Sequence, residues 1–275
     1  MNLGILLREH HDGLIKLGTR EDNPPLTRPA PANRLVWLMA RIFDLHIHTT
    51  KGSADSSLTP EDLILEAERL GLRGLCITEH AGPWDRHEFA AFAARHNVVL
   101  IRAMEADTDM GHILAFGVDR YQSGFHHAEE LSKAAHVVGG FVVSAHPFRG
   151  VLGQHHRTRP YLYPDPDEPI PREPETAMLH PVFKLADAIE VANGGTSDAE
   201  NRFAADVAHL LNLPVTGGSD AHSTHGLGRF VTEFPDEIFD EAQFLAALHR
   251  GDFRPLEGLR QGTLRPYRLR SQQGE

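Results

Sequence analysis

The sequence contains a single cysteine, Cys76, among its 275 residues. One thiol excludes an internal disulfide framework and any zinc site that is built from several cysteines. Cys76 lies in the apolar run at residues 75–77, a setting typical of a buried core thiol rather than of a reactive nucleophile. Any metal site in this chain must therefore draw on histidine and carboxylate side chains.

Long apolar runs are also missing. No stretch reaches the roughly 18 apolar residues that a membrane-spanning helix needs, and the N-terminus has no hydrophobic signal-peptide segment. We therefore expect a cytoplasmic protein without a membrane partner. With 41% hydrophobic residues, the chain can still form one large globular domain with its own core.

Basic residues are in the minority. The chain has 27 Lys and Arg against 38 Asp and Glu, which gives a net charge of −11. Proteins that bind long duplex nucleic acid rely on basic patches that contact phosphates, so this class of partner is disfavoured. A small anionic phosphorylated substrate remains possible if bound metal ions supply the positive charge.

Histidine is abundant, with 19 residues, and the most informative stretch is Phe43-Asp-Leu-His-Ile-His. In an extended strand Phe43, Leu45 and Ile47 would lie on one face, and Asp44, His46 and His48 on the other. Two imidazoles two residues apart on a strand point the same way and can share one metal ion. The alternative is an exposed strand face with no ligand, and the rest of the chain decides between the two.

Apolar strand patterns alternate with helical patterns along the chain. Further strands are predicted at 75–78, 98–104, 112–116, 141–145, 188–191 and 214–216, and helices near 60–70, 86–95, 127–138, 176–185 and 199–211. This alternation is typical of an α/β fold with a mostly parallel sheet. About seven such units in one domain favour a barrel over an open sheet.

Three segments depart from this rhythm. Residues 1–38 read as a poorly ordered extension, with Met39 as a candidate translation start, and residues 257–275 as a loose tail, which leaves a domain at 39–256. The Pro-rich insertion at 148–176 has no helical period. Because it follows a strand end that carries a histidine, we expect a lid over the site, with a passive surface insertion as the alternative.

Polar side chains gather where the predicted strands end. In parallel α/β barrels the functional face lies at the carboxyl ends of the strands. Seven candidates fall at such ends, and two more lie close to them in sequence. The strand-end residues are His46, His48, His80, Glu105, His146, Asp220 and His222, and the nearby ones are Asp55 and His112.

Taken in order, these motifs resemble the PHP (polymerase and histidinol phosphatase) family. The matching pieces are the segment at 43–48, Ile77-Thr-Glu-His, Glu105 followed by His112, Ala145-His-Pro and Gly218-Ser-Asp-Ala-His. The resemblance covers about residues 40–255. It implies a distorted (β/α)7 barrel and metal-dependent hydrolysis of phosphoesters on a cluster of up to three metal ions.

The resemblance also implies a role for each candidate ligand. It places His46, His48, Glu105 and Asp220 in a first site, Glu105, His112 and His146 in a second, and Asp55, His80 and His222 in a third. Glu105 would bridge two ions, and Glu105, Asp220 and His222 are the predicted catalytic residues. Mixed imidazole and carboxylate ligands suit two or three Zn, Mn or Fe ions. A water held between two such ions is acidified toward hydroxide, the expected nucleophile.

Several positions near these motifs need a separate interpretation. Glu79 stands where the family usually has Asp, and we expect it to support the ligands from behind. Asp55 stands where some members have His, which favours a harder ion such as Mn at the third site. Arg149 is predicted to clamp a phosphate with two hydrogen bonds, with a plain surface arginine as the alternative. Glu190 and Asn193 end another strand, and either support the ligands or face the substrate.

Three functions are compatible with these residues. The first is a phosphoesterase acting on a nucleotide, a short oligonucleotide or a phosphomonoester. The second is an amidohydrolase-like enzyme that cleaves a C–N bond with the same metal cluster. The third is a metal-binding regulatory module without turnover. Every predicted ligand position is filled in this sequence, which favours turnover.

Overall fold

The computed structural model describes residues 41–152 and 160–268. The predictions for residues 1–38 and Met39, and for residues 153–159 of the Pro-rich insertion, lie outside these ranges. Across the described ranges, every helix is too short or too polar to cross a lipid bilayer.

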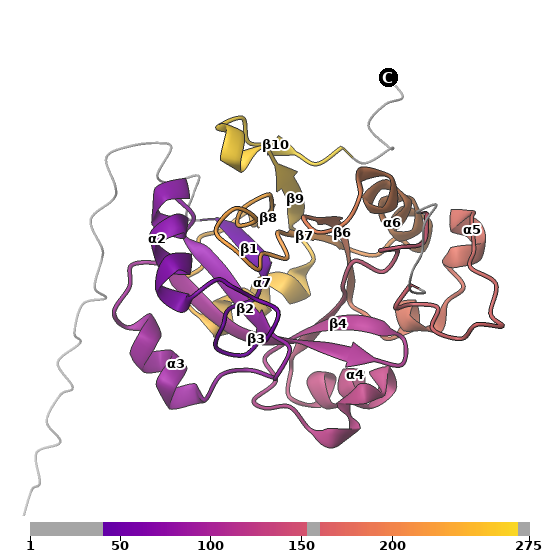
Figure 1. Ribbon diagram of the computed structural model, residues 1–275, viewed down its shortest axis with the longest axis horizontal. Coiled ribbons are helices and arrows are strands. Elements are labelled where there is room, and N and C mark those ends of the chain that lie inside the picture. Colours follow the sequence, from indigo (N-terminus) through magenta and orange to yellow (C-terminus); the bar gives the residue numbers. More distant parts are fainter. Residues whose placement is uncertain (1–40, 153–159, 269–275) are drawn as a thin grey trace, which may run out of the picture. The chain divides into compact units, whose positions relative to one another are not determined.

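The strands form one sheet in the order β10-β9-β8-β1-β2-β3-β4-β5-β6-β7 (Figure 1). Their bounds are β1 (Ile42–Ile47), β2 (Gly74–Glu79), β3 (Val99–Thr108), β4 (Gly111–Phe116), β5 (Phe141–Ser144), β6 (Ala188–Asn193), β7 (Val215–Gly218), β8 (Phe230–Glu233), β9 (Arg254–Glu257) and β10 (Arg265–Pro266).

Seven of these strands run in the same direction, namely β1, β2, β3, β5, β6, β7 and β9. β1, β2 and β3 pair in parallel, as do β5, β6 and β7. β4 lies between the two sets and is antiparallel to both neighbours, because only residues 109–110 join it to β3, too few for a parallel crossover. β8, β9 and β10 add an antiparallel extension at the other side of β1.

The sheet curls so that the chain after β7 returns to β1. Ile47 and Ala221 form a parallel bridge. The Asp220 N–H donates to the carbonyl of His46 at 2.8 Å, and the His48 N–H donates to the carbonyl of Ala221 at 3.0 Å. The predicted α/β fold with a distorted barrel is therefore confirmed, and its point of closure lies beside two candidate ligands.

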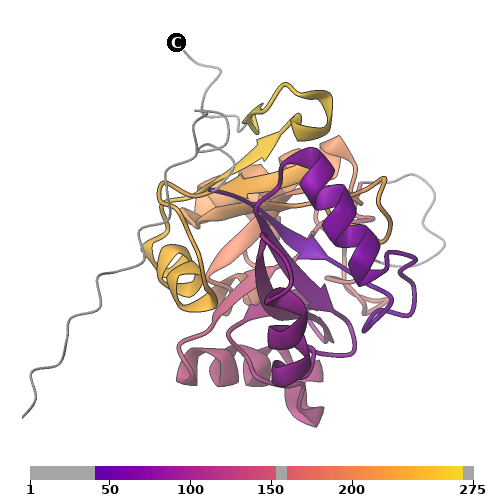
Figure 2. The same cartoon turned by 90° about the vertical axis from the view of Figure 1, so that its left-hand side faces the viewer.

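The main helices are α2 (Pro60–Leu70), α3 (Arg86–Ala93), α4 (Ala128–Val137), α6 (Asp198–Leu211) and α7 (Glu241–Arg250). Figure 2 shows α2 and α3 lying side by side along the first strands of the sheet. α2 has the predicted ends: the Thr59 side chain accepts the Asp62 N–H, and Gly71 ends the helix at φ 73°. The Thr59 cap fixes where the loop between β1 and α2 ends.

The helix predicted at 176–185 is replaced by two short turns. They are α5 (Pro174–Ala177) and the 3₁₀ helix η2 (Pro181–Lys184). Pro181 explains the difference, because its ring disfavours helical geometry at the preceding residue and it has no N–H to donate. Two further 3₁₀ turns are η1 (Ser123–His126) and η3 (Leu259–Gln261).

β1 does not keep the predicted alternation along its whole length. Its pairing with β2 shifts register between Asp44 and Ile47. Phe43 and Leu45 pack in one apolar cluster, whereas Ile47 joins Ile42 in the cluster that contains the buried faces of α2 and α3. The prediction of one apolar face was therefore wrong for Ile47, because an irregularity of this kind turns the following residues.

The end of the chain is also better packed than we predicted. Within the described residues, 257–268 are held by β10 and η3. Arg260 Nη1 donates to the carbonyls of Thr224 at 3.0 Å and Leu227 at 2.8 Å, and the Tyr267 ring lies 5.6 Å from that of Phe230. The loose tail therefore does not begin at Glu257, because these polar and aromatic contacts continue the fold beyond it.

Candidate metal centre

Eight of the nine predicted ligands come together at one edge of the sheet. Their ligand atoms form four groups, within each of which all atoms lie within 4.8 Å of one another. The groups are His46 with His48 and Glu105, His46 with His146 and Asp220, Glu105 with His112 and His146, and His48 with His80 and His222. The shared members make the groups one continuous cluster.

The direction of the strands explains this convergence. The carboxyl ends of parallel strands meet at one edge of a sheet, which brings the ends of β1, β2, β3, β5 and β7 together. His112 begins β4 rather than ending it, but β4 is antiparallel and pairs His112 with Asp107 near the end of β3. The first residues of β4 therefore reach the same edge as the last residues of its neighbours.

Glu105 lies at the middle of the cluster. Its Oε1 is 2.9 Å from His112 Nδ1 and 2.8 Å from His146 Nε2. Its Oε2 is 3.4 Å from His46 Nε2 and 3.2 Å from His48 Nε2. Each carboxylate oxygen thus faces a different pair of imidazoles, which is the arrangement that a bridging ligand requires.

The charge state of Glu105 is set by its neighbours. Burial alone would raise its pKa, but the charge of His46 and hydrogen bonds from His112 and His146 hold the pKa well below its ordinary value. Asp220 shows the same balance, with its pKa lowered by His46, His48 and Arg149 despite burial. Both carboxylates are therefore ionised and available to cations.

The third group is more open. The His48 ring is stacked between those of His80 and His222, with centroids 4.4 and 4.3 Å away. Asp55 Oδ2 lies 3.2 Å from His222 Nε2 and 3.6 Å from His80 Nε2, so the ninth predicted ligand borders this group. His80 Nδ1 is buried without a hydrogen-bond partner among the described residues, a cost that a bound cation would remove.

Asp44 does not join the cluster, although the sequence pattern puts it on the same face as His46 and His48. Its carboxylate accepts the backbone N–H groups of Ser219 at 2.8 Å and Gly228 at 2.9 Å. Burial raises the pKa of Asp44 to about 6. Asp44 therefore ties β1 to the segments that follow β7 and contributes no ligand atom.

Glu190 supports His46 from behind. Its Oε1 lies 3.0 Å from His46 Nδ1, and its Oε2 accepts the backbone N–H of His146 at 3.0 Å and the side-chain N–H of Asn193 at 2.9 Å. This contact occupies His46 Nδ1 and leaves Nε2 for the centre. Of the two alternatives for Glu190, the geometry favours the supporting one.

Arg149 lies at the edge of the cluster. Its Nη2 donates to Asp220 and, at 2.8 Å, to Asn193 Oδ1, and its Nε donates to Thr196 at 3.2 Å. The side chain is 29% exposed, and it borders the cavity in front of the cluster. Arg149 is thus fixed by three residues at the centre and is not a plain surface group.

Backbone strain coincides with two of the candidate ligands. Among the described residues, three other than glycine have positive φ: His146 at 30°, Asn212 at 52° and Asp220 at 53°. Asn212 ends α6, where a left-handed residue is ordinary. His146 and Asp220 have no such reason, and unusual backbone angles that the fold maintains are typical of functional sites.

The cluster opens into a cavity of about 380 Å³. Besides candidate ligands and Arg149, its lining includes Asp107 and Tyr161. Asp107, which sequence reasoning missed, lies with Oδ1 3.0 Å from His112 Nε2. The signal was the Glu105-x-Asp107 spacing, which puts both carboxylates on one face of β3.

Part of the Pro-rich insertion contacts this cavity. The Tyr161 ring lies 4.3 Å from the ring of His112, and Tyr161 is 57% exposed. Leu162 packs beside Gly111, and Tyr163 is buried. The described part of the insertion therefore borders the second group of ligands, while the lid itself stays a prediction.

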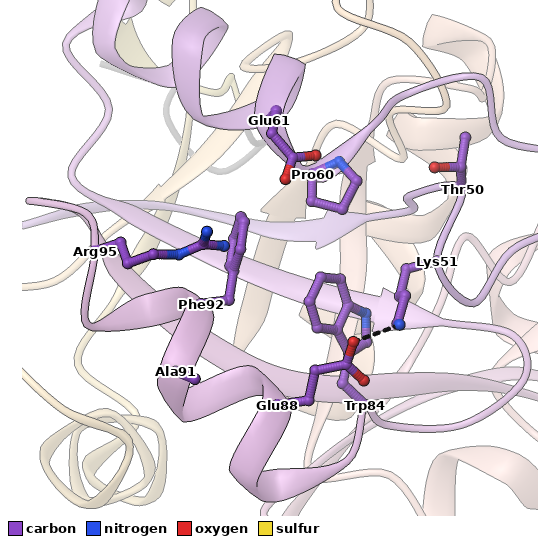
Figure 3. A pocket seen from close by; sticks show the side chains of 9 residues that line it. All are labelled: Thr50, Lys51, Pro60, Glu61, Trp84, Glu88, Ala91, Phe92 and Arg95. Carbon is purple, nitrogen blue, oxygen red and sulfur yellow. Dashed lines mark hydrogen bonds and ion pairs between the residues drawn. The ribbon is translucent and has the colours of Figure 1, made fainter.

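A larger cavity of about 570 Å³ lies between the start of α2 and the length of α3 (Figure 3). Its walls include Trp84 and Phe92, with Lys51 paired to Glu88 at 2.5 Å across the Trp84 ring. None of the nine candidate ligands lines it. We therefore assign the functional site to the smaller cavity, because the groups with suitable chemistry are there.

Two family models match the chain. Residues 44–176 match the model described as PHP domain, and residues 187–253 match the model described as PHP-associated. An error-prone DNA polymerase of Mycobacterium tuberculosis (strain ATCC 25618 / H37Rv) is 32% identical over 121 residues. That match covers 40% of this chain and 11% of the polymerase, so the chain spans about a tenth of the length of the curated relatives it matches.

Solved structures show the same fold at low sequence identity. One is a two-domain protein of Bacteroides vulgatus that contains a predicted PHP-like metal-dependent phosphoesterase, with a TM-score of 0.54 and 22% identity over 78% of this chain and 64% of that chain. Another is an amidohydrolase of Chromobacterium violaceum, with a TM-score of 0.52 and 18% identity over 75% of this chain and 96% of that one.

Proposed function

The chain belongs to the PHP domain family, and from this premise we propose that it is a metal-dependent phosphoesterase for a small phosphorylated substrate. The substrate would be a nucleotide, a short oligonucleotide or a phosphomonoester. The observation that carries the proposal is the position of Glu105, whose two oxygens face two different pairs of imidazoles.

The donor set fits more than one divalent ion. Imidazole and carboxylate ligands suit Zn, Mn or Fe, and two of the four ligand groups consist entirely of buried side chains. When bound, such ions acidify water for attack and neutralise the oxygens of a phosphoryl group. His46, His48, Glu105 and Asp220 would hold the first ion, Glu105, His112 and His146 the second, and Asp55, His80 and His222 the third.

The residues around the ions would select the substrate. Among the described residues, Arg149 is the one Lys or Arg that lines the cavity, so it would donate to a phosphoryl oxygen while Asn193 and Thr196 keep it in place. Tyr161 offers an exposed ring for stacking on a base or another planar group. A cavity of about 380 Å³ with Asp55 and Asp107 at its border would admit a short anion and repel a long one.

The experiment is a substrate screen on protein that has been stripped of metal and reloaded with Mn, Zn or Fe. The panel contains an aryl phosphomonoester, an aryl phosphodiester, nucleotides, short oligonucleotides and an N-acyl compound. We expect metal-dependent release of phosphate or cleavage of a phosphodiester, and no turnover by a Glu105→Gln variant. Cleavage of the C–N bond alone would support the amidohydrolase alternative, and fully loaded protein without any turnover would support a regulatory module.

A further inference from the structure

The hydroxyl of Ser53 has three polar partners. Ser53 lies in the loop after β1 and is 1% exposed. Its Oγ donates to Glu79 Oε2 at 2.6 Å, accepts the backbone N–H of His80 at 3.2 Å, and lies 3.0 Å from His48 Nδ1. One side chain thus contacts two candidate ligands that come from different strands, although it does not line the cavity itself.

Glu79 fixes the direction of these hydrogen bonds. The residue is fully buried, and its carboxylate also accepts from the Thr49 N–H at 3.0 Å, the Thr49 hydroxyl and the Trp84 indole N–H at 2.9 Å. A Cβ at Gly52 would lie 2.6 Å from Glu79 Cβ, so the loop packs directly on this side chain. With these donors around it, the carboxylate accepts hydrogen bonds and donates none.

The carboxylate of Glu79 also determines which groups donate and which accept in the hydrogen bonds that link Glu79, Ser53 and His48. A hydroxyl has one hydrogen, and Ser53 must give it to Glu79, which has none to offer. The lone pairs of Ser53 then accept from the His80 N–H and from His48. The neutral ring of His48 must therefore carry its hydrogen on Nδ1, which leaves the lone pair of Nε2 to bind a metal ion. Nε2 is the nitrogen that lies 3.2 Å from Glu105 and 3.4 Å from Asp220.

We propose that Glu79 and Ser53 are positioning residues that set the tautomer of His48 and hold the His80 backbone, and so prepare ligands of both the first and the third site. The inference rests on the proposed metal centre and deepens it. It differs from the contact of Glu190 with His46, where a carboxylate touches the imidazole directly. Here the carboxylate acts through the Ser53 hydroxyl, which contacts His48 after β1 and His80 after β2.

The test is a Glu79→Gln variant, which keeps the shape of the side chain and adds an N–H donor. The amide can donate to Ser53, whose own hydrogen is then free to turn toward His48 Nδ1. Nitrogen-15 NMR of the metal-free protein at alkaline pH, where His48 is neutral, reports which ring nitrogen carries the hydrogen. We expect Nδ1–H in the wild type and a gain of the Nε2–H form in the variant. Zinc affinity of the first and third sites should fall about 10–100-fold.

Trp84→Phe is the matched control, because it removes another donor to the same carboxylate without touching Ser53. We expect its His48 tautomer and zinc affinity to match the wild type, whatever its melting temperature. If Glu79→Gln does not fold, Ser53→Ala replaces it and should yield a mixture of tautomers.

Two results would overturn the inference. One is an Nε2–H tautomer in the wild type, and the other is an unchanged Nδ1–H tautomer in both Glu79→Gln and Ser53→Ala. Neither depends on turnover, so a failure here is separate from a failure of the proposed phosphoesterase activity.

Discussion

The two sides of the candidate metal centre differ in how firmly the fold holds them. On the buried side, the side chains of His46, Glu105 and Asp220 are at most 4% exposed. On the open side, His222 is 29% and Asp55 60% exposed. The buried ligands sit in strands and strand ends with fixed partners, whereas the open ones lie on loops. The fold thus preorganises one part of the site and leaves the other able to adapt to an ion or a substrate.

The same contrast appears in the protonation of the histidines. Burial would lower the pKa of His46, but the charges of Glu190, Asp220 and Glu105 raise it well above its ordinary value. Burial lowers the pKa of His80, whose carboxylate neighbours do not compensate for it. A metal ion that binds His46 must therefore displace a proton, whereas the lowered pKa of His80 favours the neutral ring. Buried His146 is an exception on its side, because burial and the charge of Arg149 lower its pKa as well.

Glu105→Gln should have the largest effect on metal content and turnover, because it removes the charge that faces both pairs of imidazoles. We expect loss of the first and second ions together and at least about a thousand-fold drop in turnover, since each ion is worth several kcal/mol to the transition state. Elemental analysis of metal content and kcat measured on the same samples check this. Normal metal content with full activity would contradict the bridging role.

Glu190→Gln should have an intermediate effect on metal affinity, and the effect should be confined to the ion on the buried side. The variant weakens the contact that orients His46, so affinity for the first ion should fall about 10–100-fold while the open-side ion is retained. Glu200→Gln is the matched control, because Glu200 is also a buried carboxylate but caps α6 through Ser197. Metal titrations that show equal losses in both variants would count against a specific role for Glu190.

Asp55→Asn should have a smaller effect, on the open side alone. Asp55 is largely exposed and borders the third group, so its loss should weaken one ion several-fold and leave the other two in place. A manganese titration should then show one weakened step out of three. Weakening of every step would mean that the two sides are not independent.

The pH dependence of metal binding should differ between the sides by a modest amount. Carboxylate neighbours raise the pKa of His112 to about 9 despite burial, and that of His46 is also raised. Near neutral pH both rings are protonated without metal, so affinity at the first and second sites should rise with pH, and at the second site the rise should level off above about 9. Calorimetry in buffers of different ionisation enthalpy measures the protons released, and zero release at neutral pH would refute this.

Much of this arrangement could be predicted from the sequence. The alternation of apolar and polar residues located the central strands, and the rule that ligands follow parallel strands pointed to seven of the nine candidate ligands, with Asp55 and His112 close to them in sequence. Pro181 was the missed signal for the break at 176–185. The loop-mediated contact between Ser53 and Glu79, 26 residues apart, could not be predicted, because it depends on how the loop folds over β2.

The contacts of the C-terminal residues were unpredictable for the same physical reason. Arg260 is an ordinary basic residue in the sequence, and only the position of the carbonyls of Thr224 and Leu227 makes it an anchor. Asp107 was overlooked because its partner His112 belongs to β4, which runs antiparallel to both of its neighbours. Sequence patterns specify which face a side chain occupies, but not which side chain of another element will meet it.

The most direct test of the central claim is anomalous diffraction from crystals of the manganese- or zinc-loaded protein. The account predicts two strong peaks on either side of Glu105, one toward His46 and His48 and one toward His112 and His146, separated by about 3.5–4 Å. A weaker third peak is expected beside His80 and His222. A single ion that does not touch Glu105, or ions bound only outside this cluster, would contradict the account.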